Sequence, residues 1–217
     1  TNGLLPGITI DKPSGILTIY DTISVARNWT LLNGQVNAAV GSNVFLHGTP
    51  FNLDMESGLG TMSFYDLTMV PLATRTLTGS VGVNNRLVLN SGVIRLSTFK
   101  LSMNTGNPAN LTRTTGYVVS ENLPATGLGK FEWSIGNAAA GNTFLYPFGG
   151  VAGIYIPYTF AVQTAGNAGG KLALSTYPTD WTASPNNLPF PTGVTNINNI
   201  LGANNFQREV DRYWLPE

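Results

Sequence analysis

The chain contains no cysteine in its 217 residues and only one histidine, His47. The lack of cysteine excludes disulfide bonds, thiolate metal sites and cysteine nucleophiles. One histidine cannot form a His-rich metal site, and no nucleophile motif accompanies it for a Ser-His-Asp triad. We therefore expect His47 to be structural or exposed, and we expect neither a metal nor a cofactor.

Charged residues are also scarce. They make up 10% of the chain, against roughly 25% of an average soluble protein. The 11 basic and 11 acidic residues are scattered and give a formal net charge of zero. Nucleic-acid binding is disfavoured, because neutralising phosphates requires clustered Lys and Arg. The polar surface must consist of Asn, Thr, Ser and Gly, which favours association with itself or with neutral polymers.

Long apolar runs are absent as well. No segment approaches the ~18 residues that a membrane-spanning helix needs, so we expect no membrane span. No signal peptide is recognisable. The chain begins at Thr1 rather than Met, and we expect a processed chain or a segment of a longer protein.

What the sequence does contain is a regular series of apolar couples. Each couple is an i,i+2 pair, so both side chains of an extended chain point to one face. Turn-forming residues such as Asn90-Ser91-Gly92 separate the couples. A chain that repeatedly extends, buries two side chains and turns is typical of a coiled β-solenoid. The clearest couples are Val81/Val83, Leu87/Leu89, Ile94/Leu96 and Leu101/Met103, which start 6, 7 and 7 residues apart.

The couples predict an all-β fold in two parts. Residues 1–110 are expected to form a right-handed parallel β-helix with about three edges per coil and roughly four to six coils. From residue 111 the strands become longer and more aromatic, which predicts a small antiparallel β-sandwich-like module over 111–217. Its closing strand is expected at 209–215. A Pro- and Asn-rich excursion spans 177–205, and a loop of that length is often functional.

Several motifs occur in an order that resembles a known family. The chain is similar to the large secreted surface proteins of Bacteroidetes that the type IX secretion system exports. The resemblance implies an extracellular or cell-surface adhesin, surface-layer or filament component. The matching segments are the coil 85–103, Gly116–Val118, Phe144–Gly149, Tyr155–Tyr158 and Val210–Trp214.

Two same-face acid couples, Asp54/Glu56 and Glu209/Asp211, are the candidates for catalysis. A glycosidase needs two carboxyl groups about 5–9.5 Å apart across a cleft, and an i,i+2 spacing permits this without indicating it. We interpret both couples as solvated strand charges and expect no catalytic residues. The glycine-rich segment 149–153 lacks the Lys-Ser/Thr ending of a phosphate loop and is interpreted as a turn.

Two further residues are candidates for binding and modification. Trp181 lies in the excursion among Thr and Ser, so its ring is the aromatic side chain that we expect to bind a glycan. Trp133, Tyr155, Tyr158 and Trp214 are expected to pack in the core of the second module or to cap it. Asp21-Thr22-Ile23 resembles the Asp-Ser/Thr-aliphatic acceptor of Bacteroidetes O-glycosylation, which makes Thr22 a glycosylation candidate.

Together these features predict a non-enzymatic structural or adhesive protein that assembles through β-edges and neutral polar surfaces. Expected partners are further copies of the chain or neighbouring modules of the same protein, with the terminal segments 1–9 and 210–217 as contacts. Glycans are the alternative partner. A glycan-binding module and a β-helix enzyme that degrades polysaccharides are the alternative functions.

Overall fold

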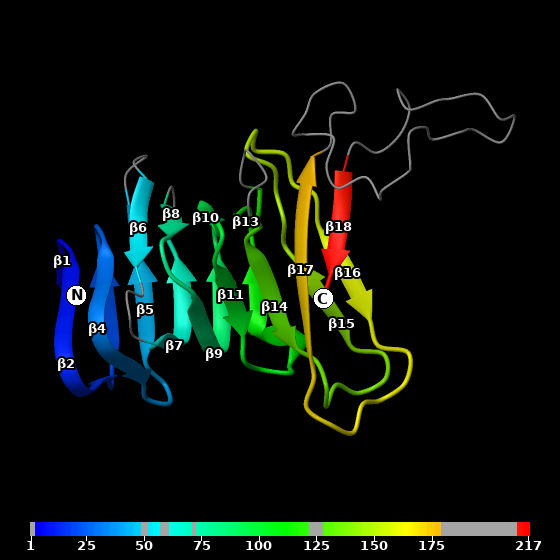
Figure 1. The fold of residues 1–217 in the computed structure, drawn as a ribbon, viewed down its shortest axis with the longest axis horizontal. Coiled ribbons are helices and arrows are strands. Elements are labelled where there is room, and N and C mark those ends of the chain that lie inside the picture. The colour runs from blue at the N-terminus through cyan, green and yellow to red at the C-terminus, as the bar shows by residue number, and fades with distance from the viewer. Residues whose placement is uncertain (1–2, 49–51, 57–60, 71–72, 122–127, 179–211) are drawn as a thin grey trace, which may run out of the picture.

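The protein is a parallel β-solenoid of about five turns, as the sequence predicts. The computed structural model describes residues 3–48, 52–56, 61–70, 73–121, 128–178 and 212–217. Successive turns stack side by side from the N-terminal strands at one end to the C-terminal strands at the other (Figure 1). The apolar interior of the stack is one continuous hydrophobic cluster.

Each turn places strands on three faces. Residues of one turn pair with residues 20 to 24 positions later on the first face, as in Leu4 with Ser24 and Val88 with Thr112. The first face contains β1 (Leu4–Leu5), β3 (Thr22–Val25), β5 (Asn43–Leu46), the ends of β7 (Thr61–Met69) and β9 (Val81–Leu89), and β12 (Leu111–Arg113). The second contains the starts of β2 (Ile8–Ile19) and β4 (Trp29–Ala38), then β6 (Asn52–Glu56), β8 (Thr74–Leu77), β10 (Val93–Arg95) and β13 (Tyr117–Val119). The third contains the ends of β2 and β4, the starts of β7 and β9, then β11 (Lys100–Met103) and β14 (Lys130–Ser134).

The apolar couples that predicted the solenoid all point inward. Each of the eight side chains from Val81 to Met103 in these couples is 2% exposed or less. In register, Val81 pairs with Met62 on one side and Leu101 on the other, so like side chains stack from turn to turn. Full burial of such a side chain contributes about 1.5–3 kcal/mol, which makes these columns the main source of stability.

Some expected turns are corners within long strands. Asn33-Gly34 is a turn-forming pair of the kind that separates the apolar couples, but β4 continues through it. Gly34 has φ +93°, and a Cβ there would lie 2.4 Å from the carbonyl oxygen of Lys12 in the turn below. Glycine therefore lets the chain bend without leaving the hydrogen-bonded ladder. The long strands join the faces into one 16-stranded sheet.

The parallel ladders continue beyond residue 110, where the sequence placed the start of the second module. β12 pairs with β9, β13 with β10, and β14 with β11, all in parallel. A short 3-10 helix, η1 (Pro108–Asn110), precedes β12. The residues from 111 look different in sequence because the last turn packs against aromatic side chains rather than against another solenoid turn.

Antiparallel strands follow at this end. β17 (Lys171–Pro178) pairs antiparallel with β14, and β18 (Arg212–Pro216) pairs antiparallel with β17. A separate hairpin joins β15 (Thr143–Tyr146) to β16 (Tyr158–Ala161). Residues 209–211 lie outside the described residues, as does most of the excursion 177–205.

Aromatic side chains close the C-terminal end of the core. Phe144, Tyr146 and Phe148 are fully buried against Phe131 and Trp133 of β14. Most of these rings meet edge-on, with centroids 5.2–6.4 Å apart, an arrangement that adds to the stabilisation from burial. The Trp133 Nε1 donates a hydrogen bond to the carbonyl oxygen of Leu145 at 3.0 Å. The core is thus covered at this end.

Candidate functional site

The first turn of the solenoid has an open edge. Among the described residues, β1 pairs only with β3 and β2 pairs only with β4. Leu5 and Leu17 are 43% and 38% exposed, whereas their register partners in the next turn, Val25 and Val36, are buried. The apolar columns of the core therefore reach the surface here, beside strand edges whose N–H and C=O groups can pair with a further strand.

A local irregularity divides this edge into two segments. The register between β2 and β4 shifts between Asp11 and Ile16, and Lys12 and Pro13 lie in the gap. A charged residue, a proline and a bulge are common protections against unwanted pairing. The stretches Ile8–Ile10 and Ile16–Ile19 on either side remain regular strand, so the protection covers only the middle of the edge.

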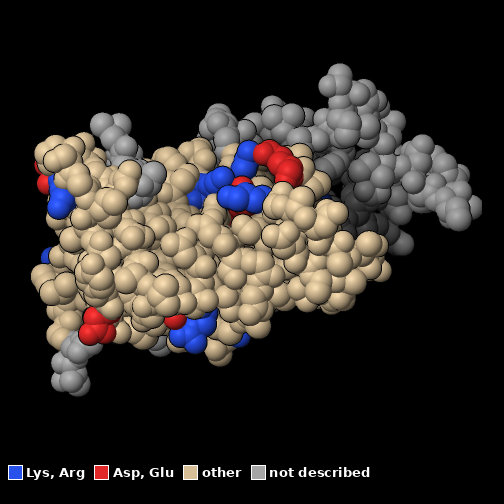
Figure 2. Space-filling view, turned by 90° about the horizontal axis from the view of Figure 1, so that it is seen from below, with Lys and Arg blue, Asp and Glu red and all other residues tan. Residues whose placement is uncertain are grey.

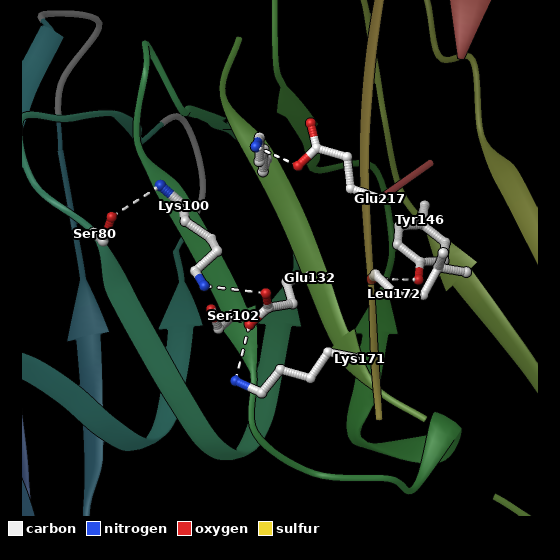
Figure 3. A network of polar contacts seen from close by, with 9 residues as sticks. Ser80, Lys100, Ser102, Glu132, Tyr146, Lys171, Leu172 and Glu217 are labelled. Atoms are coloured by element: carbon white, nitrogen blue, oxygen red, sulfur yellow. Dashed lines mark hydrogen bonds and ion pairs between the residues drawn. The ribbon is translucent and has the colours of Figure 1, made fainter. Parts of the chain in front are cut away.

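On the face that Figure 2 shows, the few charges gather into small clusters, and the rest of the described surface is uncharged. The cluster with the most contacts lies on the third face, and we call it the charged patch: Lys100, Lys130, Glu132, Lys171 and Glu217. Lys100 and Lys171 each place Nζ 3.0 Å from a different oxygen of the Glu132 carboxylate (Figure 3). Lys130 pairs with Glu217 at 2.5 Å. Each lysine of the patch thus has a carboxylate partner.

Glu132 is the best-connected acid of the patch. Its side chain is 10% exposed, and it also accepts a hydrogen bond from Ser102 Oγ at 3.1 Å. Burial raises the pKa of the Glu132 carboxyl, but hydrogen bonds from Lys171, Lys100 and Ser102 outweigh burial and hold the pKa below its ordinary value. Such a carboxylate supports the fold most strongly in its ionised form.

Replacing Glu132 by Gln is expected to lower the free energy of unfolding at pH 7 by about 2 kcal/mol, because the charge-assisted hydrogen bonds are weakened. The pKa of Glu132 in the folded protein lies below its value in the unfolded chain. The ionised carboxylate therefore contributes its full stabilisation of the fold above about pH 4.5. This contribution is lost as the pH falls through the folded-state pKa. Urea unfolding of both proteins between pH 7 and pH 3 measures this. The two curves should converge in acid; a constant difference across this range would contradict the assignment.

A buried cation lies inside the solenoid, which the sequence analysis did not single out. Arg75 in β8 is fully buried and faces inward at the register position of Ile94. Its guanidinium donates to the backbone carbonyl oxygens of Val25, Arg27 and His47. Burial lowers its pKa to about 10, which reflects the desolvation of a charge without an acidic partner among the described residues. The i,i+2 series Ala73, Arg75, Leu77 was the signal that could have found it.

A buried ion pair fastens the last strand. Arg212 Nη2 of β18 lies 2.5 Å from Glu121 Oε1, and the Glu121 side chain is 1% exposed. The other oxygen of Glu121 accepts a hydrogen bond from the backbone N–H of Val151 at 2.9 Å. Arg212 also donates to Thr176 Oγ1 at 3.3 Å. This pair holds β18, β17 and the turn after β15 together, a structural role.

The residues that the sequence singled out do not converge on one site. Trp181 and the couple Glu209/Asp211 lie outside the described residues, and the side chains of Asp54 and Glu56 in β6 are likewise outside them. Thr22 begins β3, is half-buried, and its backbone N–H donates to Asp21 Oδ1 at 2.7 Å. Its glycosylation stays a prediction.

His47 and the other aromatic residues have structural surroundings. The carbonyl of His47 accepts from Arg75, and burial together with the Arg75 charge lowers the pKa of the imidazole. Trp133 is fully buried, whereas Trp214 and Tyr158 are half-buried and pack against each other with tilted rings, their centroids 5.3 Å apart. These placements agree with the expected core and capping roles.

The described residues offer neither a metal site nor a membrane-spanning helix. They contain no group of three or more His, Cys, Asp or Glu side chains placed to hold a metal ion. Nor do they contain a helix with the length and apolar character needed to cross a bilayer. Comparison with known proteins found no matching family model, no matching curated protein and no matching solved structure.

Proposed function

We propose that the protein is an extracellular structural or adhesive component, part of a surface layer or filament, that associates through the edges of its β-solenoid. The observation that carries the proposal is the open first turn, where Leu5 and Leu17 are exposed although their register partners are buried. A strand edge beside exposed apolar side chains is a template for pairing with another strand.

Strand direction favours continuation of the stack from copy to copy. β17 runs antiparallel to β14 and β18 antiparallel to β17, so β18 has the same direction as β14 and as the other strands of the third face. Among the described residues, the outer edge of β18 has no partner. The end of β2 from a second copy could pair there in parallel. A head-to-tail contact of this kind produces open filaments.

The charge distribution also supports association. The net charge is zero, and Lys100, Lys130, Lys171, Arg86 and Arg212 each contact a carboxylate within the chain. Little long-range repulsion therefore opposes contact between copies. The location at the cell surface and export by type IX secretion rest on the resemblance of the ordered motifs alone, and they belong to this proposal.

The test is to place a charge on the open turn. Leu17→Lys is expected to weaken self-association by at least about tenfold, because burying an unpaired ammonium in an apolar contact costs more than about 1.4 kcal/mol. Sedimentation velocity across a concentration series measures this, and negative-stain micrographs should show elongated particles of the unmodified protein only.

Val40→Lys is the matched control, because Val40 is 83% exposed between β4 and β5, on neither the first turn nor β18. It should leave association unchanged. A monodisperse monomer at every concentration of the unmodified protein would reject the proposal, as would equal effects of the two substitutions.

A second candidate function is glycan binding. Trp181, the residue expected for it, lies outside the described residues. A cavity near the last turn, lined by Asn, Ser and Lys side chains and by glycines, favours this function independently.

A further inference from the structure

A cavity of about 480 Å³ opens beside the charged patch, within the ~300–1,000 Å³ range of small-molecule sites. It lies where the chain leaves β11, where β14 ends and where β17 begins. Four side chains line it, those of Asn104, Ser134, Asn137 and Lys171, together with glycines 106, 136, 169 and 170. Aromatic and aliphatic side chains are absent from this described lining.

The glycines shape the cavity by backbone contact. A Cβ at Gly136 would lie 1.9 Å from the backbone nitrogen of Gly170, so the two segments touch. The backbone N–H groups of Ile135 and Gly136 both donate to the Gly170 carbonyl, at 2.9 and 3.0 Å. In contrast, a Cβ at Gly169 would meet nothing within 4 Å. The wall formed by Gly136 and Gly170 is therefore held by backbone hydrogen bonds, whereas Gly169 borders open space.

Several hydrogen-bond donors and acceptors of the cavity lining are available to a ligand. The Ser134 hydroxyl and the Asn137 amide have no hydrogen-bond partner among the described residues. Asn104 donates through Nδ2 to Asn84 Oδ1 at 2.9 Å, and this leaves its own Oδ1 able to accept. A ligand with several hydroxyl groups suits such a set, since each hydroxyl both donates and accepts.

The charge beside the cavity indicates that the ligand also carries a negative group. Lys171 contacts Glu132, but Lys100 contacts the same carboxylate. Two ammonium groups thus share one negative charge, which leaves one positive charge in surplus beside the cavity. Lys171 has two further protons to donate and its side chain is 52% exposed, so it can reach an anionic group.

We propose that this cavity binds an acidic saccharide, a polyhydroxylated ring whose carboxylate pairs with Lys171 while its hydroxyls bond to Ser134, Asn137 and Asn104. The inference deepens the glycan-binding candidate and is independent of self-association, because the described lining of the cavity includes no residue of β2 or β18, the strands proposed to meet. Loss of one activity leaves the other testable.

The test compares D-glucuronate with D-glucose, which differ by a carboxylate in place of a hydroxymethyl group. Titration of the ¹⁵N-labelled protein should shift the backbone amide signals of Gly136, Gly169 and Gly170. Glucuronate should bind about threefold or more tightly than glucose, the size expected for one half-exposed ion pair. That preference should disappear in 0.5 M salt.

Three variants locate the site. Lys171→Gln should abolish the preference for glucuronate, whereas Lys130→Gln, a change in the same patch outside the cavity lining, should retain it. Gly169→Leu should block both sugars, because the new side chain has room to enter the open space without disturbing the fold. Absence of shifts at these glycines with both sugars would overturn the proposal. So would equal binding of the two sugars, or a glucuronate preference that persists in Lys171→Gln.

Discussion

Truncation of Arg75 to Ala is expected to lower the free energy of unfolding by about 4 kcal/mol. The substitution leaves a cavity in a close-packed core, and it leaves the carbonyl oxygens of Arg27 and His47 without their donor. The carbonyl oxygen of Val25 keeps its hydrogen bond from the His47 backbone N–H. Cavities left by large core side chains cost about 2–5 kcal/mol, and each unsatisfied buried polar group costs about 1–3 kcal/mol. Relief from desolvating a buried charge offsets part of this loss.

Two further variants separate the causes. Arg75→Met keeps most of the volume without the donors and should lose about 2 kcal/mol. Arg86→Ala removes an arginine whose side chain is 48% exposed and pairs with Asp66 at 3.1 Å, so it should lose less than about 1 kcal/mol. Urea denaturation followed by circular dichroism measures all three. A Met variant as stable as the unmodified protein would mean that the carbonyl contacts contribute nothing.

Replacing Trp133 by Ala is expected to have a comparable effect, a loss of about 4 kcal/mol. The indole is fully buried, lies edge-on to Phe144 at 5.2 Å and donates to the Leu145 carbonyl. Its removal empties the junction between β14 and the hairpin β15–β16. The midpoint of urea unfolding should fall accordingly, and the signals of the hairpin should shift most in an NMR spectrum.

Tyr20→Ala is the matched aromatic control for Trp133. Tyr20 is 78% exposed, so its truncation should change stability by less than about 0.5 kcal/mol. Comparable losses in the two variants would contradict the view that the aromatic cluster closes the solenoid. A large loss for Trp133→Ala alone would show that this end of the core depends on its cap.

The two ends of the solenoid differ in a way that bears on assembly. At the C-terminal end, Phe144, Tyr146 and Phe148 cover the core. At the N-terminal end, Leu5 and Leu17 stay exposed. The outer edge of β18 offers one strand of matching direction, whereas the first turn offers segments on all three faces. Pairing through β18 would therefore use only the third face of the first turn.

The sequence alone determined the solenoid and the interior. Couples such as Leu87/Leu89 predict which side chains face inward, because side chains alternate between the two faces of a strand and this alternation depends only on neighbouring residues. The scarcity of charge likewise fixed the neutral character of the surface. The closing strand was also expected near its observed position, with β18 at Arg212–Pro216.

Only the tertiary structure decided which polar residues meet. Glu132 contacts Lys100 and Lys171, which are 32 and 39 positions away in the chain, and Arg75 reaches carbonyls 28 to 50 positions away. The number of residues in a turn varies from one turn to the next, because the corners differ in length. Which residue of one turn lies beside which residue of the next is therefore set by the stacking of the turns. A corner such as Gly34 bends the strand where the sequence indicated a break. The interior follows from local alternation, whereas the charged patch, the buried arginine and the cavity follow from register between turns.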